Sequence, residues 1–313
     1  MPAPVYLFTG FLDSGKTTLI KDTLQDPQFM NGIERTLILC FEQGEVEYTN
    51  EFLDKHNCFI EFFDASTELT LERIKELDTI YHPNQVFIEY NGSESVSELL
   101  LNGMPDYWPL VQILTTVDAS TFQSFIGNLR NLLFEQLRYS DVVICNRCTE
   151  DTSATLLRGN IKAINKRAQI FYEGEFGKPI ELKEGFLPFD KNAKTIDIKD
   201  DDYGLWYMDA VDHPDSYEDK KIILRGKYAE AIPGYDHSFI LGRQAMVCCA
   251  QDTSLCGITV TGVKVNEMTL GDWYQIEGNL KTVPLQNGGK TLVVYATAAQ
   301  PYHGPEDEYV YFS

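Results

Sequence analysis

The stretch GFLDSGKTT at residues 10–18 decides the fold. It fits the pattern G-x-x-x-x-G-K-[ST], with Gly10, Gly15, Lys16 and Thr17 at the fixed positions. In such a loop the glycines let successive backbone N–H groups point at a phosphate, the lysine reaches the β- and γ-phosphates, and the hydroxyl holds Mg²⁺. The positive end of the following helix faces the same anion. The pattern therefore predicts a nucleoside triphosphate site.

The residues on either side of this loop have the character that it needs. Residues 5–9 (VYLFT) form a short apolar run that reads as a buried strand, and residues 17–25 (TTLIKDTLQ) read as a helix. The Asp26-Pro27 pair would end that helix, because proline disfavours the helical conformation of the residue before it. The alternative is a glycine turn with a solvated lysine, and the strand and helix favour the phosphate loop.

Length and composition limit the number of domains and the kinds of partner that this chain can have. A chain of 313 residues is long enough for two domains, and its 43% of hydrophobic residues is typical of a globular protein. The formal net charge of -21 disfavours nucleic acid and anionic lipid as partners. The first residues, MPAPVYLF, include no basic region, so we expect a cytoplasmic protein. Seven cysteines, an odd number, favour free thiols or metal ligands over a disulfide framework.

Apolar runs alternate with helical patterns through the first half of the chain. After the first, the runs that read as strands are residues 35–41, 58–63, 85–88, 111–117, 141–145 and 169–172. Helices are expected at residues 68–80, 95–101, 119–125, 129–139 and 151–164. This alternation predicts an α/β fold with a mostly parallel sheet, whose ligands bind beyond the carboxyl ends of the strands. We expect one shared site from the residues at those ends, which are Gly10, Glu42, Glu89, Asp118 and Asn146.

The pattern changes after about residue 175. Residues 177–202 are rich in Lys, Asp, Gly and Pro and read as a linker, and no long helix is evident beyond them. Short β-rich runs follow at residues 221–224, 237–247, 257–265, 273–277 and 291–297. They predict a small β-barrel or sandwich, similar to an OB-fold. The expected organisation is therefore a nucleotide-binding domain at 1–176, a linker at 177–202 and an all-β domain at 203–313.

Five segments of the first half carry motifs in a set order. They are GFLDSGKTT (10–18), FEQGE (41–45), FIEYNG (87–92), TTVDAS (115–120) and FEQLRYSDVVICN (134–146). Together they resemble the CobW branch of the CobW/HypB/UreG P-loop GTPases, and the resemblance covers about residues 4–172. It implies a P-loop NTPase fold that binds GTP and Mg²⁺, in a family of metal-insertion and metal-trafficking proteins.

The resemblance also implies roles for individual residues. The implied nucleotide-binding residues are Gly10, Asp13, Ser14, Gly15, Lys16, Thr17, Thr18, Asn146 and Arg147. The implied catalytic residues are Lys16, Glu42 and Glu89. The implied Mg²⁺ ligands are Thr17, Glu42, Glu89 and Asp118.

Each acidic residue of this set has a simpler interpretation. Glu42 and Glu89 could be acidic strand ends that face solvent, and Asp118 could cap a helix that begins at Ala119. Asp13 is unusual beside phosphates, because like charges repel. It could be a solvated loop residue, face away from the nucleotide, or contact a partner subunit across a dimer.

The chain departs from the pattern of the family at two sites in this half. FFDASTEL at residues 62–69 stands where the family has a Cys-x-Cys-Cys metal motif, so metal transfer by that route is in doubt. NRCT at residues 146–149 replaces the guanine-reading Asn-Lys-x-Asp, and Thr149 cannot accept two hydrogen bonds as a carboxylate would. GTP remains the expected nucleotide, and Glu150 or Asp151 could take the place of the missing carboxylate. The alternative is that selectivity for the base is lost.

The second half departs from the family altogether. GRQAMVCCAQD, TVTGV and a tryptophan before IEGNL resemble a β domain in the partner subunit of a bacterial permease. Three thiols, Cys248, Cys249 and Cys256, are a candidate Zn²⁺ site with His237 as the fourth ligand. Adjacent residues of a strand point to opposite faces, so only one of the neighbouring pair easily joins such a site. The alternative is that these cysteines pack in the core.

Two functions from different classes follow. The first is a slow, Mg²⁺-dependent GTPase of metal trafficking or metal-cofactor insertion, with a switch at residues 41–49. The alternative is a nucleotide-gated adaptor with weak hydrolysis that works with a membrane permease or a metalloprotein client. The missing Cys-x-Cys-Cys motif favours the adaptor, whereas Glu42 and Glu89 favour the enzyme. A kinase of small substrates is a third interpretation, which the EQG and VDA segments oppose. A homodimer is a further expectation.

Overall fold

The chain forms two compact units. The computed structural model describes residues 2–182, 187–249, 252–285 and 289–312. One unit consists of residues 1–152 and 164–183, and the other of residues 153–163 and 184–313. The boundaries and the linker predicted from the sequence stay a prediction.

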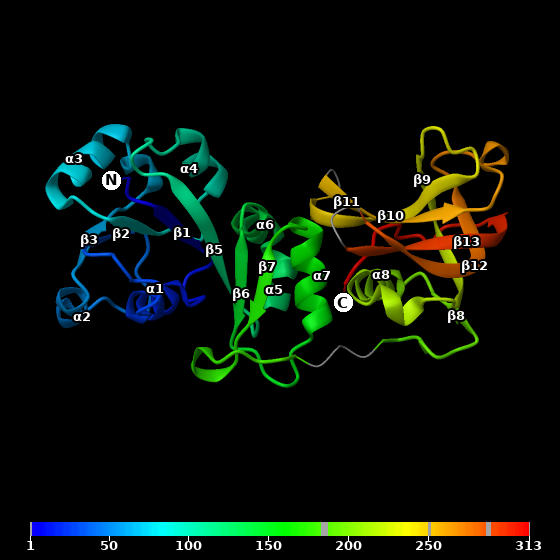
Figure 1. The fold of residues 1–313 in the computed structure, drawn as a ribbon, viewed down its shortest axis with the longest axis horizontal. Coiled ribbons are helices and arrows are strands. Elements are labelled where there is room, and N and C mark those ends of the chain that lie inside the picture. The colour runs from blue at the N-terminus through cyan, green and yellow to red at the C-terminus, as the bar shows by residue number, and fades with distance from the viewer. Residues whose placement is uncertain (1, 183–186, 250–251, 286–288, 313) are drawn as a thin grey trace. The chain divides into compact units, whose positions relative to one another are not determined.

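The first unit is built on a seven-stranded parallel sheet in the order β3-β2-β4-β1-β5-β6-β7 (Figure 1). The strands are β1 (Val5–Thr9), β2 (Thr36–Cys40), β3 (Cys58–Phe62), β4 (Gln85–Glu89), β5 (Leu110–Asp118), β6 (Val142–Asn146) and β7 (Gln169–Tyr172). Its helices are α1 (Lys16–Gln25), α2 (Asn50–Lys55), α3 (Leu71–Tyr81), α4 (Val96–Asn102), α5 (Phe122–Asn128) and α6 (Arg130–Arg138). The predicted α/β fold with a parallel sheet is confirmed.

The two faces of this sheet bury different sets of side chains, because successive residues of a strand point to opposite faces. Val5 and Leu7 of β1 belong to one apolar core together with residues of α3 and α4, such as Leu77. Phe8 belongs to a second core together with residues of α1 and α2, such as Ile20. Helices accordingly lie on both sides of the strands in Figure 1.

Two helices of this unit differ from expectation. The helix α2 was not predicted, because six residues with one buried side chain, Leu53, are too short to show a period. It is capped by Thr49, whose side chain accepts a hydrogen bond from the Phe52 N–H. The helix α5 begins at Phe122 rather than Ala119, so Asp118 does not cap it.

The second unit is built on a six-stranded sheet that closes into a barrel. Its strands are β8 (Thr195–Asp197), β9 (Lys221–Ala231), β10 (Ser238–Cys249), β11 (Asp252–Thr261), β12 (Trp273–Pro284) and β13 (Lys290–Pro301). Their order is β10-β11-β13-β12-β9-β8, and β10 also pairs with β9, which closes five strands into a ring. The predicted small barrel is therefore confirmed, although β8 lies in the region that reads as a linker.

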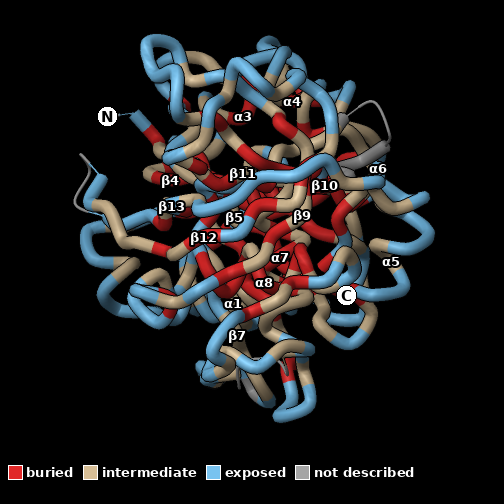
Figure 2. The backbone as a smooth tube through the Cα atoms, turned by 90° about the vertical axis from the view of Figure 1, so that its right-hand side faces the viewer, coloured by how far each residue is buried: buried red, intermediate tan, exposed pale blue. Residues whose placement is uncertain are grey.

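The second unit also contains two helices, of which one was concealed by the β-rich pattern. The helix α8 (Tyr203–Asp212) corrects the expectation of no long helix beyond residue 202. Its sequence, YGLWYMDAVD, is apolar on most sides and therefore gives no clean helical period. Trp206 and Tyr203 are buried in the core of the unit, and Figure 2 shows this buried stretch in red. The helix α7 (Ala154–Ile164) contributes residues 154–163 to the same unit.

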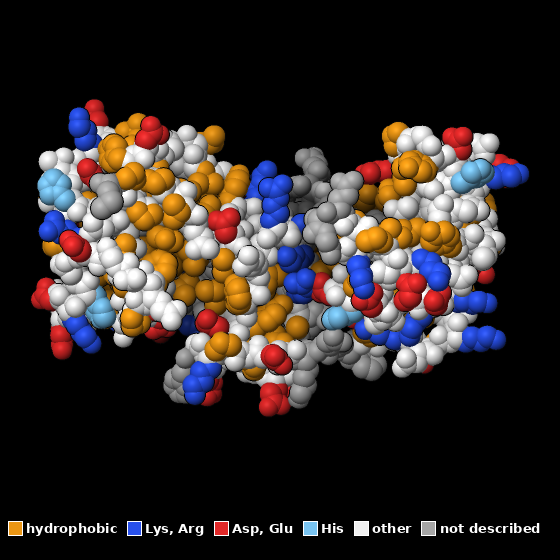
Figure 3. All heavy atoms as spheres, in the orientation of Figure 1, with side chains coloured by type: hydrophobic (Ala, Val, Ile, Leu, Met, Phe, Trp, Pro, Cys, Tyr) orange, Lys and Arg blue, Asp and Glu red, His pale blue; other side chains and the backbone are white. Residues whose placement is uncertain are grey.

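Apolar side chains also reach the surface. They gather on the face of the first unit that Figure 3 presents, among charged side chains of both signs. The exposed large apolar residues of this unit include Ile80, Leu101 and Val111. Such exposure is ordinary for a folded protein. Within the described residues, no helix is both long and apolar enough to cross a membrane.

Candidate nucleotide-binding site

The loop between β1 and α1 has the backbone that its sequence predicts. Gly10 and Gly15 have φ angles of 126° and 104°, in the region that favours glycine. A Cβ atom at Gly10 would lie 2.4 Å from the Thr116 carbonyl oxygen, and one at Gly15 would lie 2.5 Å from Asn146 Nδ2. Both glycines are therefore required by close approach as well as by conformation.

Lys16 lies over the centre of the loop. Its Nζ donates to the carbonyl oxygens of Gly10 at 2.8 Å and Phe11 at 2.9 Å, and pairs with Glu42 Oε2 at 2.5 Å. The side chain of Lys16 is only 3% exposed. A phosphate oxygen that binds this ammonium group would therefore compete with the carboxylate of Glu42.

Glu89 ends β4 beside Thr17, the second residue of α1. Its Oε1 accepts from the Thr17 hydroxyl at 2.5 Å, and its Oε2 accepts from the Tyr48 hydroxyl at 2.6 Å. Burial raises the pKa of Glu89, while the two hydroxyls and then Lys16 act in the opposite direction. The buried carboxylate of Glu89 thus accepts one hydrogen bond from the phosphate loop and one from the 41–49 segment.

One small cleft brings together most of the predicted site residues. It has a volume of about 50 Å³. Its lining includes Asp13, Gly15, Lys16, Thr17, Thr18, Glu42, Glu89 and Arg147. The donors offered there by Thr17, Glu42 and Glu89 are hard oxygen atoms, which suit Mg²⁺ when phosphates complete its coordination. The residues therefore fit this ion.

Asp13 joins the phosphate loop to the 41–49 segment. Its φ angle is 57°, and its Oδ1 accepts from the backbone N–H of Glu45 at 2.9 Å. A Cβ atom at Gly44 would lie 2.3 Å from the same Oδ1. This contact within the chain was not among the roles that the sequence suggested for Asp13. With Glu42 and Tyr48 it makes a third contact between the segment and the site.

Asn146 and Arg147 hold the loop from the other side. Asn146 Nδ2 donates to the Ser14 carbonyl oxygen at 2.6 Å, and within the described residues its buried Oδ1 has no partner. Arg147 donates to the Asp13 carbonyl oxygen at 3.0 Å and to Asp118 Oδ2 at 2.7 Å. Both residues thereby fix the shape of the phosphate loop.

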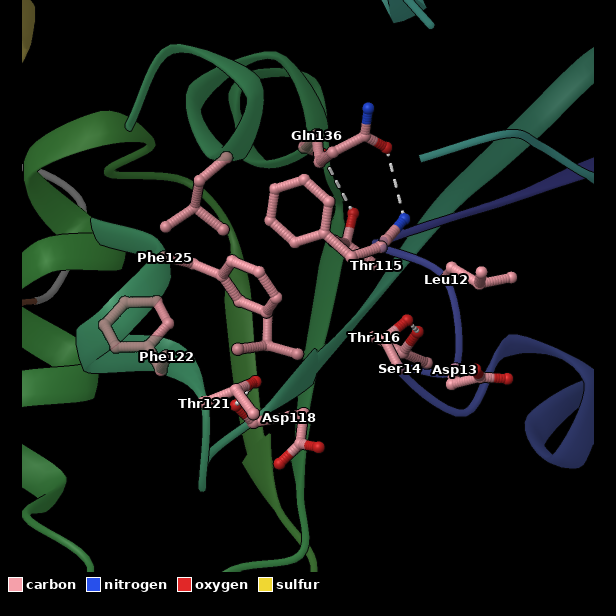
Figure 4. Close-up of a pocket in the computed structure, with 14 residues that line it drawn as sticks. Leu12, Asp13, Ser14, Thr115, Thr116, Asp118, Thr121, Phe122, Phe125 and Gln136 are labelled. Carbon is pink, nitrogen blue, oxygen red and sulfur yellow. Dashed lines mark hydrogen bonds between the residues drawn. The ribbon is translucent and has the colours of Figure 1, made fainter. Parts of the chain in front are cut away.

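Asp118 does not join the predicted Mg²⁺ ligands. Its Oδ1 accepts from the backbone and the hydroxyl of Ser120, at 2.9 and 2.6 Å, while Oδ2 pairs with Arg147. It lines a separate cavity of about 180 Å³, drawn in Figure 4, rather than the cleft of Thr17 and Glu89. The structure therefore brings together three of the four predicted ligands.

That cavity reveals a residue that sequence reasoning missed. Gln136 is buried, and its Oε1 accepts from the Gly10 N–H at 3.1 Å (Figure 4). On the same side, the Ser14 hydroxyl lies 2.6 Å from the Thr116 hydroxyl. The ring of Phe125 lies against that of Phe11, with centroids 4.5 Å apart. The only signal for Gln136 was its place in the FEQ segment.

Comparison of the sequence with family models identifies the family to which this chain belongs. Residues 4–172 match the family model described as CobW/HypB/UreG, nucleotide-binding domain. The chain belongs to the CobW/HypB/UreG family. Residues 182–312 match a second family model, described as the DUF1980 C-terminal domain. The resemblances inferred for the two halves are thereby confirmed, and the CobW/HypB/UreG proteins are P-loop GTPases.

Solved structures show low similarity to this family member. Zn(II)-bound YjiA GTPase from E. coli is 16% identical, with 89% of this chain and 86% of that chain covered and a TM-score of 0.45. A Zn(II)-bound triple mutant of YjiA GTPase is 16% identical, with 96% and 90% covered and a TM-score of 0.46. The hydrogenase maturation factor HypB from Archaeoglobus fulgidus is 18% identical, with 56% and 84% covered and a TM-score of 0.42. A comparison with curated proteins gives no significant match.

The predicted role of position 149 in reading the base can be tested directly. Thr149 is exposed, and its backbone N–H donates to Thr152 Oγ1 at 2.8 Å. We expect Thr149→Asp to raise the preference for GTP over ATP about tenfold or more, because a carboxylate can accept two hydrogen bonds from guanine. Competition binding of GTP, ATP and XTP measures this change, with Thr149→Asn as the uncharged control. A strong GTP preference in the unmodified protein, unchanged by Thr149→Asp, would show that another residue reads the base.

The two predicted zinc ligands whose side chains are described, Cys256 and His237, do not lie together. Cys256 is buried opposite Arg243 in the β10–β11 ladder, whereas the His237 carbonyl accepts from the Gly262 N–H. Six residues of strand separate these two points, roughly 20 Å. Cys256 and His237 therefore cannot share an ion within one chain, which corrects that part of the prediction. The side chains of Cys248 and Cys249 lie outside the described residues.

The buried position of Cys256 gives a further expected result. Among the described residues, no group of three or more His, Cys, Asp or Glu side chains could hold a metal ion. We expect Cys256→Ser to leave the Zn²⁺ content of the full chain unchanged, measured by atomic emission after purification without chelator. The Cys248→Ser and Cys249→Ser variants are the matched comparison. A fall of half an equivalent or more in Cys256→Ser alone would restore this thiol as a ligand.

Proposed function

We propose that the protein is a Mg²⁺-dependent GTPase that couples nucleotide state to the conformation of residues 41–49. One observation carries this proposal. Within that single segment, Glu42 pairs with the phosphate-loop lysine, and Tyr48 holds Glu89, whose other oxygen binds Thr17. The segment therefore contacts both groups that a triphosphate and its metal ion would use.

Different residues of this chain would have different roles in phosphoryl transfer to water. Lys16 and the backbone N–H groups of the loop bind the β- and γ-phosphates and neutralise their charge. Thr17, Glu42 and Glu89 would hold Mg²⁺, which when bound supplies further charge neutralisation. Glu89 also lies at the end of β4, where a carboxylate can orient an attacking water. Catalysis of this kind rests on positioning, so turnover without a partner is expected to be slow.

The switch follows from competition for Lys16. When a γ-phosphate takes the ammonium group of Lys16, the carboxylate of Glu42 loses its partner at 2.5 Å. The contact of Asp13 with the Glu45 N–H transmits any movement of the phosphate loop to the same segment. Hydrolysis and phosphate release would restore the pair. This is an order change of a short segment controlled by the terminal phosphate.

The proposed biological setting is metal trafficking or metal-cofactor insertion in the cytoplasm. A metalloprotein client or a membrane permease would read the 41–49 segment, and a homodimer is one form in which it could act. Zn²⁺ would be cargo, and its ligands would not include the Cys256 and His237 pair. The family membership supports the nucleotide part of this proposal.

One experiment tests the proposed reaction. Phosphate release is measured with GTP and with ATP side by side, with Mg²⁺ present, and with or without Zn²⁺ or Co²⁺. We expect slow release from GTP that requires Mg²⁺, and stimulation by the metal that serves as cargo. Release from ATP but not GTP would overturn the nucleotide assignment.

The second candidate is the nucleotide-gated adaptor. It is favoured by the sequence FFDASTEL at residues 62–69, which stands in place of the family's Cys-x-Cys-Cys motif. The same assay separates the two candidates. Tight GTP binding with no measurable phosphate release, even with metals, would favour the adaptor over the enzyme.

A further inference from the structure

A cavity of about 710 Å³ opens in the second unit, far along the chain from the phosphate loop. It lies where β9 and β10 separate, because the described pairing of these strands stops at the pair Gly242 and Lys227. The cavity is lined on one side by Lys227, Arg243 and Trp273. On the other side it is lined by the acidic residues 306–308, which follow the last strand of the barrel.

Arg243 is a buried charge inside the barrel. Arg243 lies on the same face of β10 as the buried Leu241 and Ala245, and it is 3% exposed. Its guanidinium carbon lies 5.5 Å from the ring centroid of Tyr203 and 5.3 Å from that of Trp273.

The hydrogen bonds of Arg243 leave part of its guanidinium unsatisfied. One terminal nitrogen donates to the Asp200 carbonyl oxygen at 2.7 Å and pairs with Asp200 Oδ1 at 3.4 Å, and the other reaches the Asp307 carbonyl oxygen at 3.4 Å. Within the described residues, its buried Nε has no partner. The charge of Arg243 is therefore paired, and one buried donor, Nε, still lacks the acceptor that such groups normally have.

An acidic segment of the chain itself lies against this cavity. We call residues 304–309 the C-terminal strap. The carboxylate of Glu308 in the strap accepts from Lys227 Nζ at 2.6 Å and from the indole nitrogen of Trp273 at 3.1 Å. The bond from Lys227, and then that from Trp273, hold the pKa of Glu308 below its ordinary value. The wall of the cavity is therefore built to accept a carboxylate.

The backbone beside the strap is open to pairing. Just after the strap, the Val310 N–H donates to the Gln244 carbonyl oxygen at 2.9 Å, and Val310 forms a single parallel bridge with Ala245. An extended segment that follows this edge of β10 gains backbone hydrogen bonds as well as side-chain contacts.

We propose that this cavity binds an extended acidic peptide segment of another protein, which replaces the C-terminal strap. The pair that holds the strap joins Lys227, 33% exposed, to Glu308, 53% exposed, so water reaches both groups and the pair can open. The incoming segment would place a carboxylate between Lys227 and Trp273 and an acceptor at Arg243 Nε. Val310 and Phe312, which follow the strap, are buried and stay in place when residues 304–309 are displaced, so the occupant is a segment of a separate protein.

The test uses the full chain and, as the probe, a labelled peptide with the sequence of residues 304–311, GPEDEYVY, which contains the strap and the two residues after it. Fluorescence anisotropy measures its affinity. Tryptophan emission gives a second readout, because Trp108 and Trp206 are fully buried and only Trp273 lines the cavity. We expect Glu308→Gln, which weakens the resident strap, to bind the probe about tenfold more tightly than the unmodified chain. The probe in which glutamine replaces the third acidic residue should bind at least tenfold more weakly.

Matched variants separate recognition from loss of folding. In the Glu308→Gln background, Lys227→Gln should weaken binding about tenfold or more, whereas Lys221→Gln, exposed at the start of the same strand, should not. Circular dichroism melting checks that each variant is folded. Equal binding of the glutamate and glutamine probes by folded Glu308→Gln would overturn the proposal, as would equal effects of the two lysine variants. Displacement of the probe by a single-stranded oligonucleotide, or a dimer of Glu308→Gln in light scattering, would assign the cavity to nucleic acid or to a second copy instead.

Discussion

Replacing Lys16 with alanine should weaken the binding of GTP and ATP by at least about 100-fold. In the unmodified chain the Nζ of Lys16 lies over the phosphate loop, 2.8 and 2.9 Å from two loop carbonyl oxygens. Hydrogen bonds to charged groups contribute about 1.5–3 kcal/mol each, so the loss of two phosphate contacts accounts for that factor. Titration with a fluorescent nucleotide analogue measures the dissociation constant.

The control for this prediction is Lys75→Ala, which removes an exposed lysine from α3. It should leave nucleotide affinity unchanged. Lys16→Ala also leaves Glu42 without its ionic partner, so thermal unfolding is followed in parallel. A folded Lys16→Ala variant that binds both triphosphates as well as the unmodified chain would show that the loop does not hold phosphate.

Replacing Glu89 with glutamine should lower kcat for GTP hydrolysis by at least about 100-fold, the scale expected for a carboxylate that orients water or holds the metal. Affinity for GTP without Mg²⁺ should change by less than about threefold, because Lys16 and the backbone of the loop remain. One of the hydroxyls of Thr17 and Tyr48 can still donate to the amide oxygen, and the other can accept from the amide NH₂. Phosphate release at saturating GTP measures kcat, with Glu72→Gln on α3 as the exposed control.

The pKa of Glu89 predicts the accompanying effect on stability. Burial raises this pKa above that of the unfolded chain. The stabilisation associated with the protonated carboxyl is therefore complete below the unfolded pKa and is lost as pH rises through the folded pKa. Glutamine carries no charge, so the free energy of unfolding of Glu89→Gln should vary less with pH over that window. A folded variant that retains full kcat would remove Glu89 from the proposed mechanism.

The sequence predicted what is encoded locally. The nine residues of the phosphate loop carry their own geometry, because Gly10 and Gly15 fix the curl and the adjoining strand and helix fix its direction. The carboxyl ends of parallel strands share one edge of the sheet, so the meeting of Glu42 and Glu89 with Lys16 and Thr17 also followed from topology. The family match came from the same short segments.

Side-chain contacts between segments that are distant in the sequence could not be predicted from local motifs or from strand order. Tyr48 contacts Glu89, 41 residues away, and Gln136 contacts Gly10, 126 residues away. The 41–49 and FEQ segments that contain them did not show which of their side chains reach the site. Asp13 was difficult to interpret, because its partner is a backbone N–H on a second loop. Asp118 was placed at the right edge of the sheet, yet Arg147 and Ser120 hold its carboxylate elsewhere. Those outcomes depend on side-chain direction, which strand order alone does not give.

The path of α7 has a consequence for dissecting the protein by truncation. The chain leaves the first unit after residue 152, contributes α7 to the second unit, and returns at residue 164. A Cβ atom at Gly159 would lie 2.7 Å from Phe312, so this helix is shaped to fit the far end of the chain. A fragment that stops at residue 176 would carry this helix face bare and would tend to self-associate. A fragment that begins at residue 203 would lack it, together with β8. The two halves are interlaced along the chain, so each is better studied by substitution within the intact polypeptide than in isolation.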